Sequence, residues 1–266
     1  RKRGVRSGYT AEIVTSEYIA QSQTYILPIN VILSGATAGN RKTRLAIEDA
    51  LGDVQAMYRS RSIELAISII ERPDLPSILP SPAKGDILYE DLARQYPFAI
   101  NLVFGVDVRG LSEPHDEFSI VGSTPLPAVP TPKSAVAFSI IDLAGSDGEF
   151  DSDRLDKSDS IGDQRFDRET QQMATVIAHG IGHGAGLTDT VTIISSKVIA
   201  SDPYLDTQSC TKRRGDCTAE RGANENIMFP FTLKRKESGK SFLVREKLSP
   251  SQRLVIVNYL LAQPLI

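Results

Sequence analysis

Runs of apolar residues typical of β-strands occur at four places between residues 25 and 143. Residues 25–34 (YILPINVILS) have the composition of a buried strand, and residues 63–71 (IELAISIIE) alternate between apolar and polar positions as strands do. Residues 98–108 (FAINLVFGVDV) and 135–143 (AVAFSIIDL) are two further strand candidates. A shorter strand is expected at 117–121 (EFSIV), so the pattern predicts five strands in all.

Two helices are predicted between the first three of these strands. Asn40 can cap the first helix, which runs to about Tyr58 with apolar residues at helical spacing. The proline-rich residues 73–84 form a loop, and a short helix near 87–95 follows it. The order β-α-β-α-β, followed by two more strands, predicts an α/β (α+β) fold with a twisted, mostly parallel five-stranded sheet and helices packed on it.

Beyond these strands the pattern changes from apolar to polar and back. Residues 145–169 are acidic and polar, which predicts an exposed loop, and a helix begins at about Arg168. The chain closes with Ser249 as a helix cap, Pro250 in the first turn, and an apolar helix through Leu261. We therefore expect a helical C-terminal end.

Composition narrows the possible partners. The chain has 266 residues, of which 41% are hydrophobic and 24% charged, as in ordinary globular proteins. Its net charge of -3 gives no indication of a nucleic-acid partner. No apolar run approaches the roughly 20 residues that cross a bilayer, so no transmembrane segment is expected. The chain begins at Arg1 without an apolar signal region, and we expect that a signal or pro-segment has been removed.

The segment with the most informative candidate functional residues is TVIAHGIGHGAGLTDT, residues 175–190. His179 and His183 are four residues apart, so on a helix their imidazoles lie on one face and can bind one metal ion. Gly186 can end that helix in a left-handed turn, which brings Asp189 round as a third ligand. Two histidines, one carboxylate and an open fourth position are typical of a catalytic zinc site.

This segment resembles the metzincin signature HExxHxxGxxH, in the variant that ends in Asp. His179, His183, Gly186 and Asp189 fall on the first ligand, second ligand, turn glycine and third ligand. Further on, NIMFP around Met228 is similar to the Met-turn that lies beneath the metal in this clan. The resemblance implies a Zn²⁺-dependent metalloendopeptidase that cleaves a peptide or protein substrate.

The resemblance also implies a domain plan. Residues 1–24 would be an N-terminal tail or extension, residues 25–186 the N-terminal subdomain with the metal helix, and residues 187–266 a smaller C-terminal subdomain that ends in a helix. Metzincins bind their peptide as an added strand along the sheet edge above the metal, and we expect that edge at 135–143.

One position departs from the signature. The glutamate that acts as general base is expected at position 180, where this chain has Gly180. The chain is therefore expected to cleave peptides very slowly or not at all, and Gly180→Glu is expected to raise the rate at least ~10²-fold. Three explanations stay open: an engineered inactive protease, a natural pseudoprotease, and an extracellular peptide-binding or protein-binding module on the same fold.

Two further features bear on location and on other metals. Cys210 and Cys217 are close together in a polar stretch, so they form either a small disulfide ring or two unrelated thiols of a cytosolic protein. The disulfide, together with the fact that metzincins are typically secreted, predicts an extracellular protein. The acidic residues between Asp147 and Asp163 are either a solvated loop or a Ca²⁺ site, but they do not match the D-x-[DN]-x-[DN]-G calcium loop.

Overall fold

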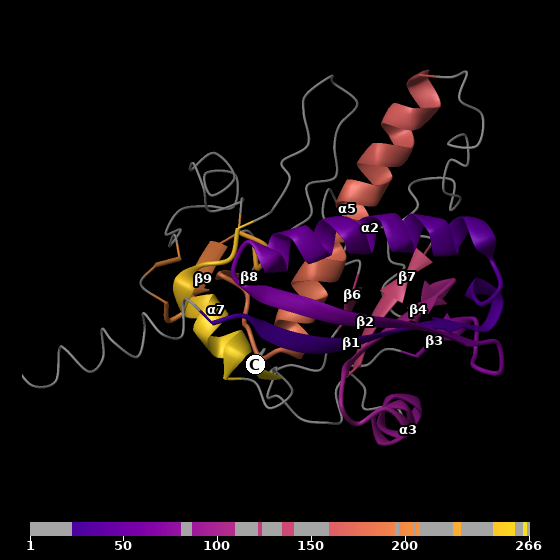
Figure 1. Cartoon of the computed structure of the whole chain (residues 1–266), viewed down its shortest axis with the longest axis horizontal. Coiled ribbons are helices and arrows are strands. Elements are labelled where there is room, and N and C mark those ends of the chain that lie inside the picture. Colours follow the sequence, from indigo (N-terminus) through magenta and orange to yellow (C-terminus); the bar gives the residue numbers. More distant parts are fainter. Residues whose placement is uncertain are drawn as a thin grey trace, which may run out of the picture.

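The centre of the computed structural model is a parallel sheet of four strands in the order β2-β1-β4-β7 (Figure 1). The structure describes residues 23–80, 87–109, 122–123, 135–140, 160–194, 197–204, 206–207, 226–229, 247–258 and 263–264. The bounds of the parallel strands are β1 (Tyr25–Ser34), β2 (Ile63–Arg72), β4 (Ile100–Gly105) and β7 (Ala135–Ser139).

Two short antiparallel strands extend this sheet. β6 (Gly122–Ser123) pairs with β7 on its outer side, and β10 (Gln263–Pro264) pairs with the first residues of β1. The expectation of a five-stranded sheet was therefore wrong, because among the described residues the sheet has four parallel strands and six strands in total. The strand expected at 117–121 lies outside the described residues. It was also wrong to expect the C-terminal part to end in a helix, since β10 follows the last helix. Two-residue strands leave no alternation in the sequence from which to predict them.

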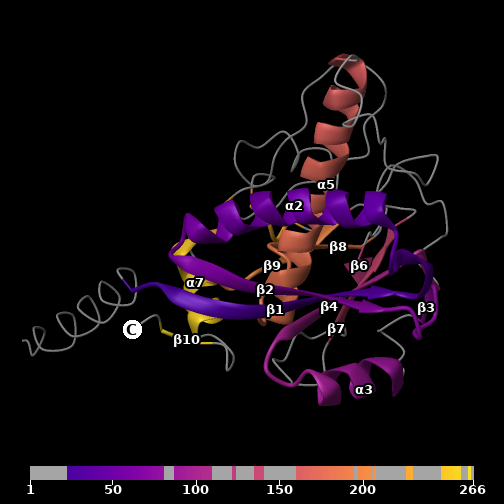
Figure 2. The same cartoon turned by 45° about the vertical axis from the view of Figure 1, so that its right-hand side comes forward.

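Helices cover both faces of the sheet, as Figure 2 shows. α2 (Arg41–Arg59) and α5 (Ser160–Gly184) lie on one face, and α3 (Ile87–Gln95) lies on the other. α2 begins where predicted, because the Asn40 side chain accepts hydrogen bonds from the backbone N–H groups of Lys42 and Thr43. Strands covered on both faces are apolar at nearly every position, which explains the continuous apolar runs in the sequence.

α5, the metal helix, begins earlier than expected. It starts at Ser160 rather than near Arg168, so the exposed loop predicted at 145–169 is wrong from residue 160 onward. Figure 1 shows the first half of this helix projecting beyond α2 and away from the sheet. A helical segment with no sheet beneath it needs no apolar stripe, and SIGDQRFDRE has none that would predict it.

The C-terminal part adds small elements beside the end of α5. They are a hairpin of β8 (Val191–Ile194) and β9 (Lys197–Ser201), a turn at residues 226–229, and α7 (Pro250–Val257). Ser249 caps α7 with a complete capping box and Pro250 occupies its first turn, as predicted. The remaining elements are η1 (Gly35–Thr37) and a small parallel pair of β3 (Ile78–Leu79) and β5 (Asp107–Val108).

The core has one apolar cluster on each side of the sheet. The larger cluster joins α2, α5, the turn at 226–229 and α7 to the sheet, and the smaller one joins α3 to the opposite face. Neighbouring residues of β1 divide between them, with Val31 in the larger cluster and Ile32 in the smaller. Among the described residues, no helix has both the length and the apolar character to cross a membrane. The division into subdomains at residue 186 stays a prediction.

Candidate metal centre

The structure brings the three predicted metal ligands together. His179 and His183 lie in the last turns of α5, and Asp189 follows the helix. Asp189 Oδ1 is 3.4 Å from His179 Nε2 and 3.3 Å from His183 Nε2. The ligand atoms of these three residues all lie within 4.8 Å of one another, so the group can hold a metal ion.

The turn after α5 explains how Asp189 reaches the histidines. Gly186 has a φ of +93°, in the left-handed region that glycine adopts cheaply. Its N–H donates to the carbonyl of His183 at 2.9 Å, and the N–H of Leu187 donates to the carbonyl of Gly182 at 2.9 Å. These two bonds define a Schellman motif, which ends the helix and reverses the chain toward the metal face.

Backbone carbonyls fix the tautomer of both histidines. His179 Nδ1 is 2.8 Å from the carbonyl oxygen of Ile227, and His183 Nδ1 is 2.9 Å from that of Leu187. A carbonyl can only accept a hydrogen bond, so each Nδ1 must carry the proton. In the neutral form of each ring, Nε2 is then the unprotonated nitrogen and faces Asp189, which is the form that binds a metal.

The environment of Asp189 fits a bound cation. Its Oδ1 atom is buried and accepts no hydrogen bond in the structure. When both rings are neutral, Asp189 Oδ1 faces two further electron-pair donors, the Nε2 atoms, at 3.4 and 3.3 Å. Such an arrangement is repulsive unless a cation lies between the donors, and a buried carboxylate oxygen without a partner is costly. The donor set therefore fits a divalent metal.

The turn at 226–229, with Met228 buried in it, packs directly beneath the metal helix. Met228 is 0% exposed, and a Cβ atom added to Gly182 would collide with its Sδ atom. The carbonyl of Met228 also accepts a hydrogen bond of 2.9 Å from the N–H of Thr190. This turn is thus in contact with α5 on one side and with the residue after Asp189 on the other.

α2 supports the metal helix from the opposite side. The hydroxyl of Tyr58 donates a hydrogen bond of 2.8 Å to the carbonyl of Ala178, the residue before His179. Burial raises the pKa of Tyr58, so its hydroxyl keeps the proton over the whole physiological range. This contact has no local sequence signal, because the two residues are 120 positions apart.

Position 180 faces the sheet rather than open space. A Cβ atom added to Gly180 would lie 2.7 Å from Phe138 Cζ and 2.9 Å from Val136 Cγ1. Phe138 is fully buried, and its ring stacks on Phe104 with centroids 4.7 Å apart. A glutamate at position 180 must therefore displace buried side chains of β7.

Of the other predictions about the site, the structure contradicts one and leaves two untested. The substrate edge expected at 135–143 was wrong, because β7 lies between β4 and β6 and so is not an edge strand. β6 is the outer strand on that side among the described residues. Cys210, Cys217 and the acidic residues 147–159 lie outside the described residues, so the disulfide and the calcium alternative stay predictions.

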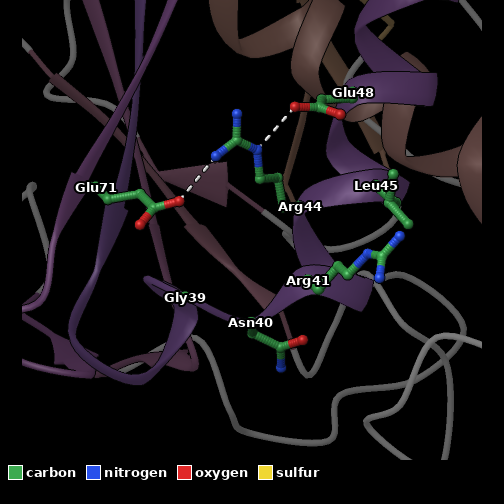
Figure 3. Close-up of a pocket in the computed structure, with 7 residues that line it drawn as sticks. All are labelled: Gly39, Asn40, Arg41, Arg44, Leu45, Glu48 and Glu71. Atoms are coloured by element: carbon green, nitrogen blue, oxygen red, sulfur yellow. Dashed lines mark hydrogen bonds and ion pairs between the residues drawn. The ribbon is translucent and has the colours of Figure 1, made fainter.

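A separate pocket of about 370 Å³ lies at the N-terminal end of α2 (Figure 3). Arg44 bonds there to Glu48 at 2.8 Å and to Glu71 at 2.9 Å, so the charged groups at its centre pair with one another. It holds none of the three metal-centre residues. Its lining residues are Gly39, Asn40, Arg41, Arg44, Leu45, Glu48 and Glu71.

Comparison with known proteins adds no relative. No protein-family model matches this chain, and no curated protein matches its sequence. The resemblance to metzincins therefore rests on the metal-centre residues and on the turn that contains Met228.

Proposed function

We propose that this chain is a metzincin-like domain that binds one Zn²⁺ through His179, His183 and Asp189. The observation that carries the proposal is the group of three ligand atoms within 4.8 Å of one another, with both histidine Nδ1 atoms bonded to backbone carbonyls. Two imidazoles and one carboxylate are a ligand set of catalytic zinc, with a fourth position left for water or substrate. Zinc held in this way polarises a peptide carbonyl and acidifies its bound water.

We further propose that the protein as it stands is a very poor peptidase. Hydrolysis requires a proton acceptor beside the attacking water, and Gly180 offers none. Among the described residues, Asp189 is the one acidic member of the metal cluster, and as a ligand it is not available as the base. The chain therefore keeps the groups that hold a metal and lacks the group that moves the proton.

The packing at position 180 favours a natural pseudoprotease or peptide-binding module as the second candidate. The Phe138 ring and Val136 fill the volume into which a side chain at 180 would project. A single engineered replacement of glutamate would leave space at that point rather than a close-packed aromatic ring. The expected ligand in either case is a peptide or a protein.

Metal analysis tests the zinc site. Protein incubated with zinc and freed of excess metal is expected to hold about one Zn²⁺ per chain, as one three-ligand site implies. Asp189→Ala is expected to lose most of this zinc while the protein stays folded. Asp74→Ala, which removes an exposed carboxylate outside the cluster, is the matched control and is expected to keep it. Equal zinc contents in the two variants would contradict the ligand assignment.

Peptide cleavage tests the missing base. A fluorogenic peptide library is assayed with the wild type, Gly180→Glu and the double variant Gly180→Glu/Phe138→Ala, with a chelator control. The double variant has room for the glutamate and is expected to cleave at least ~10²-fold faster than the wild type. Gly180→Glu alone is expected to gain less, because it must displace Phe138.

Three outcomes separate the candidates. If the double variant binds zinc but cleaves no peptide in a chelator-sensitive way, the protease proposal fails and the binding module takes its place. If the wild type already cleaves at a comparable rate, another group is the base. If Gly180→Glu alone matches the double variant, Phe138 is no obstacle. Extracellular location is a separate proposal, and titration of the unreduced, unfolded protein is expected to find no free thiol at Cys210 or Cys217.

A further inference from the structure

The turn at 226–229 is hydrogen-bonded to both chain segments that carry the predicted metal ligands. The carbonyl of Ile227 accepts the Nδ1 proton of His179 at 2.8 Å. The next carbonyl, that of Met228, accepts the N–H of Thr190 at 2.9 Å, and Thr190 is the residue directly after Asp189. The position of this turn therefore sets both the ring orientation of the first ligand and the course of the chain at the third.

A buried pair of side-chain amides holds that turn in place. Asn226 Nδ2 donates to Gln252 Oε1 at 2.9 Å, and Gln252 Nε2 donates back to Asn226 Oδ1 at 3.2 Å. Asn226 Oδ1 also accepts the N–H of Met228 at 2.9 Å. Asn226 is 8% exposed and Gln252 is 0% exposed, so water does not compete for these bonds.

Gln252 is itself fixed by the start of α7. Its backbone N–H donates to Ser249 Oγ at 3.1 Å, and its Oε1 accepts the N–H of Ser249 at 2.9 Å. The second of these bonds, which comes from the Ser249 backbone, orients the side chain that reaches Asn226. Because both ends of the Gln252 amide are bonded, the side chain forms a rigid link between α7 and the turn.

We propose that Gln252 is a positioning residue of the metal centre, which acts through Asn226 and the turn on His179 and Asp189. The proposal rests on the proposed zinc function and deepens it. Gln252 touches neither histidine nor Asp189 in any of its hydrogen bonds, so its effect on the metal must be transmitted. Groups that orient metal ligands typically change metal affinity about 10–100-fold when they are removed.

Two variants of Gln252 test this role. Gln252→Leu removes both amide bonds, and we expect Zn²⁺ affinity to fall about 10-fold, the low end for loss of an orienting partner. Gln252→Glu keeps the size of the side chain and its acceptor oxygen, but the ionised carboxylate cannot donate to Asn226 Oδ1. We expect it to fold even where the leucine variant does not, and to bind zinc more weakly than the wild type. Affinity is measured by competition with a chromophoric chelator.

Ser249→Ala is the matched control. It removes the side-chain cap of α7 and so destabilises the same helix, while the amide pair and the Ser249 backbone N–H remain. A residue with a merely structural role would affect zinc binding no more than this cap does. We therefore expect the control to bind zinc within about threefold of the wild type, well inside the 10–100-fold range of orienting groups.

Hydrogen exchange of the metal-free proteins gives a second measurement. The amide protons of Met228 and Thr190 are expected to exchange faster in both Gln252 variants than in Ser249→Ala at equal global stability. If the wild type binds zinc and the folded Gln252 variants match Ser249→Ala in affinity and exchange, the positioning role is refuted. If the wild type binds no zinc, the proposed function fails, and exchange at these two amides still decides whether Gln252 holds the turn.

Discussion

The central sheet and the wall of the metal centre are held by different interactions. β1 pairs along its whole length with β2 and on its other side with β4, and most of its apolar side chains are buried. The wall, formed by residues 226–229 and α7, also buries polar side chains. These are Asn226, Ser249, Gln252 and Arg253, and each is hydrogen-bonded to a specific partner.

Because of this difference, the two regions contribute differently to the stability of the fold and to the geometry of the metal site. Burial of apolar surface is non-directional and is spread over many residues of the sheet. Hydrogen bonds have narrow distances and angles, so a few of them can fix a carbonyl beneath a histidine. Changes in the sheet should therefore lower stability and leave the metal site of the folded molecules intact. Changes to the wall's hydrogen bonds that reach residues 226–229 should affect the site more than their stability cost suggests.

Ile29→Ala is expected to have the largest effect on stability. Ile29 lies in the middle of β1 and is 0% exposed, so its truncation leaves a cavity and should cost about 2–5 kcal/mol. Urea unfolding measures this loss. Zinc affinity of the folded fraction is expected to stay at the wild-type value, and a large drop in affinity would show that the sheet and the metal site are not separable.

Metal removal is the next largest perturbation. Zinc at 100 times its dissociation constant should stabilise the wild type by about 2.7 kcal/mol, since the unfolded chain lacks the assembled site. Asp189→Ala should abolish most of this gain, whereas Ile29→Ala should retain it. Thermal unfolding with and without a chelator compares the three proteins. Equal zinc-induced shifts in all three would place the metal elsewhere.

Arg253→Met tests the part of the wall that lies away from the metal. Arg253 Nε donates to the carbonyl of Arg61 at 2.6 Å, and its Nη2 donates to that of Gln23 at 2.7 Å. The variant leaves both carbonyls unpaired, and after relief of the buried charge we expect a loss of about 2 kcal/mol. Zinc affinity should not change, because this link does not reach residues 226–229. Urea midpoints and chelator competition measure the two quantities.

Asp202→Asn and Asp206→Asn are expected to have the smallest effects, of opposite sign. Burial raises the pKa of Asp202, so its ionised form costs stability above that pKa, and the cost disappears as the pH falls through it. Asp202→Asn should therefore raise the Tm by about 1–3 °C at pH 8 and have less effect in acid.

Asp206 is the matched contrast. Burial raises its pKa, but hydrogen bonds from the Ser251 N–H and the Ser249 hydroxyl outweigh burial and lower the pKa overall. Its carboxylate therefore stabilises the fold above the unfolded-state pKa, and this contribution is lost as the pH falls through the folded-state pKa. Asp206→Asn should lower the Tm at pH 8 and have little effect in acid. The same direction of change in both variants would refute the assignment.

Local patterns in the sequence predicted the features whose residues lie close together along the chain. β1 and α3 occupy the residues expected, because an apolar run and a helical period are each contained within about ten residues. The metal ligands could be predicted for the same reason, since two lie one helical turn apart and Gly186 determines where the third returns. α2 was recognisable from its cap at Asn40.

Contacts between distant segments could not be predicted from one sequence. Nothing in the chain indicates that Phe138 fills the space beside Gly180, or that Gln252 pairs with Asn226. The expected substrate edge at 135–143 was wrong for the same reason, because the two-residue strand β6 covers β7 without an apolar run. The early start of α5 was missed because its first residues lack a helical apolar stripe.

The two histidines also differ in the chain length that must close to orient them. His183 is oriented by a carbonyl four residues further on, whereas His179 depends on one 48 residues further on. Closing the short loop is entropically cheap and fast, and closing the long one is slower. During folding, α5 and its Schellman turn can thus orient His183 before residues 226–229 arrive. We expect the docking of this later segment to fix the His179 ring last.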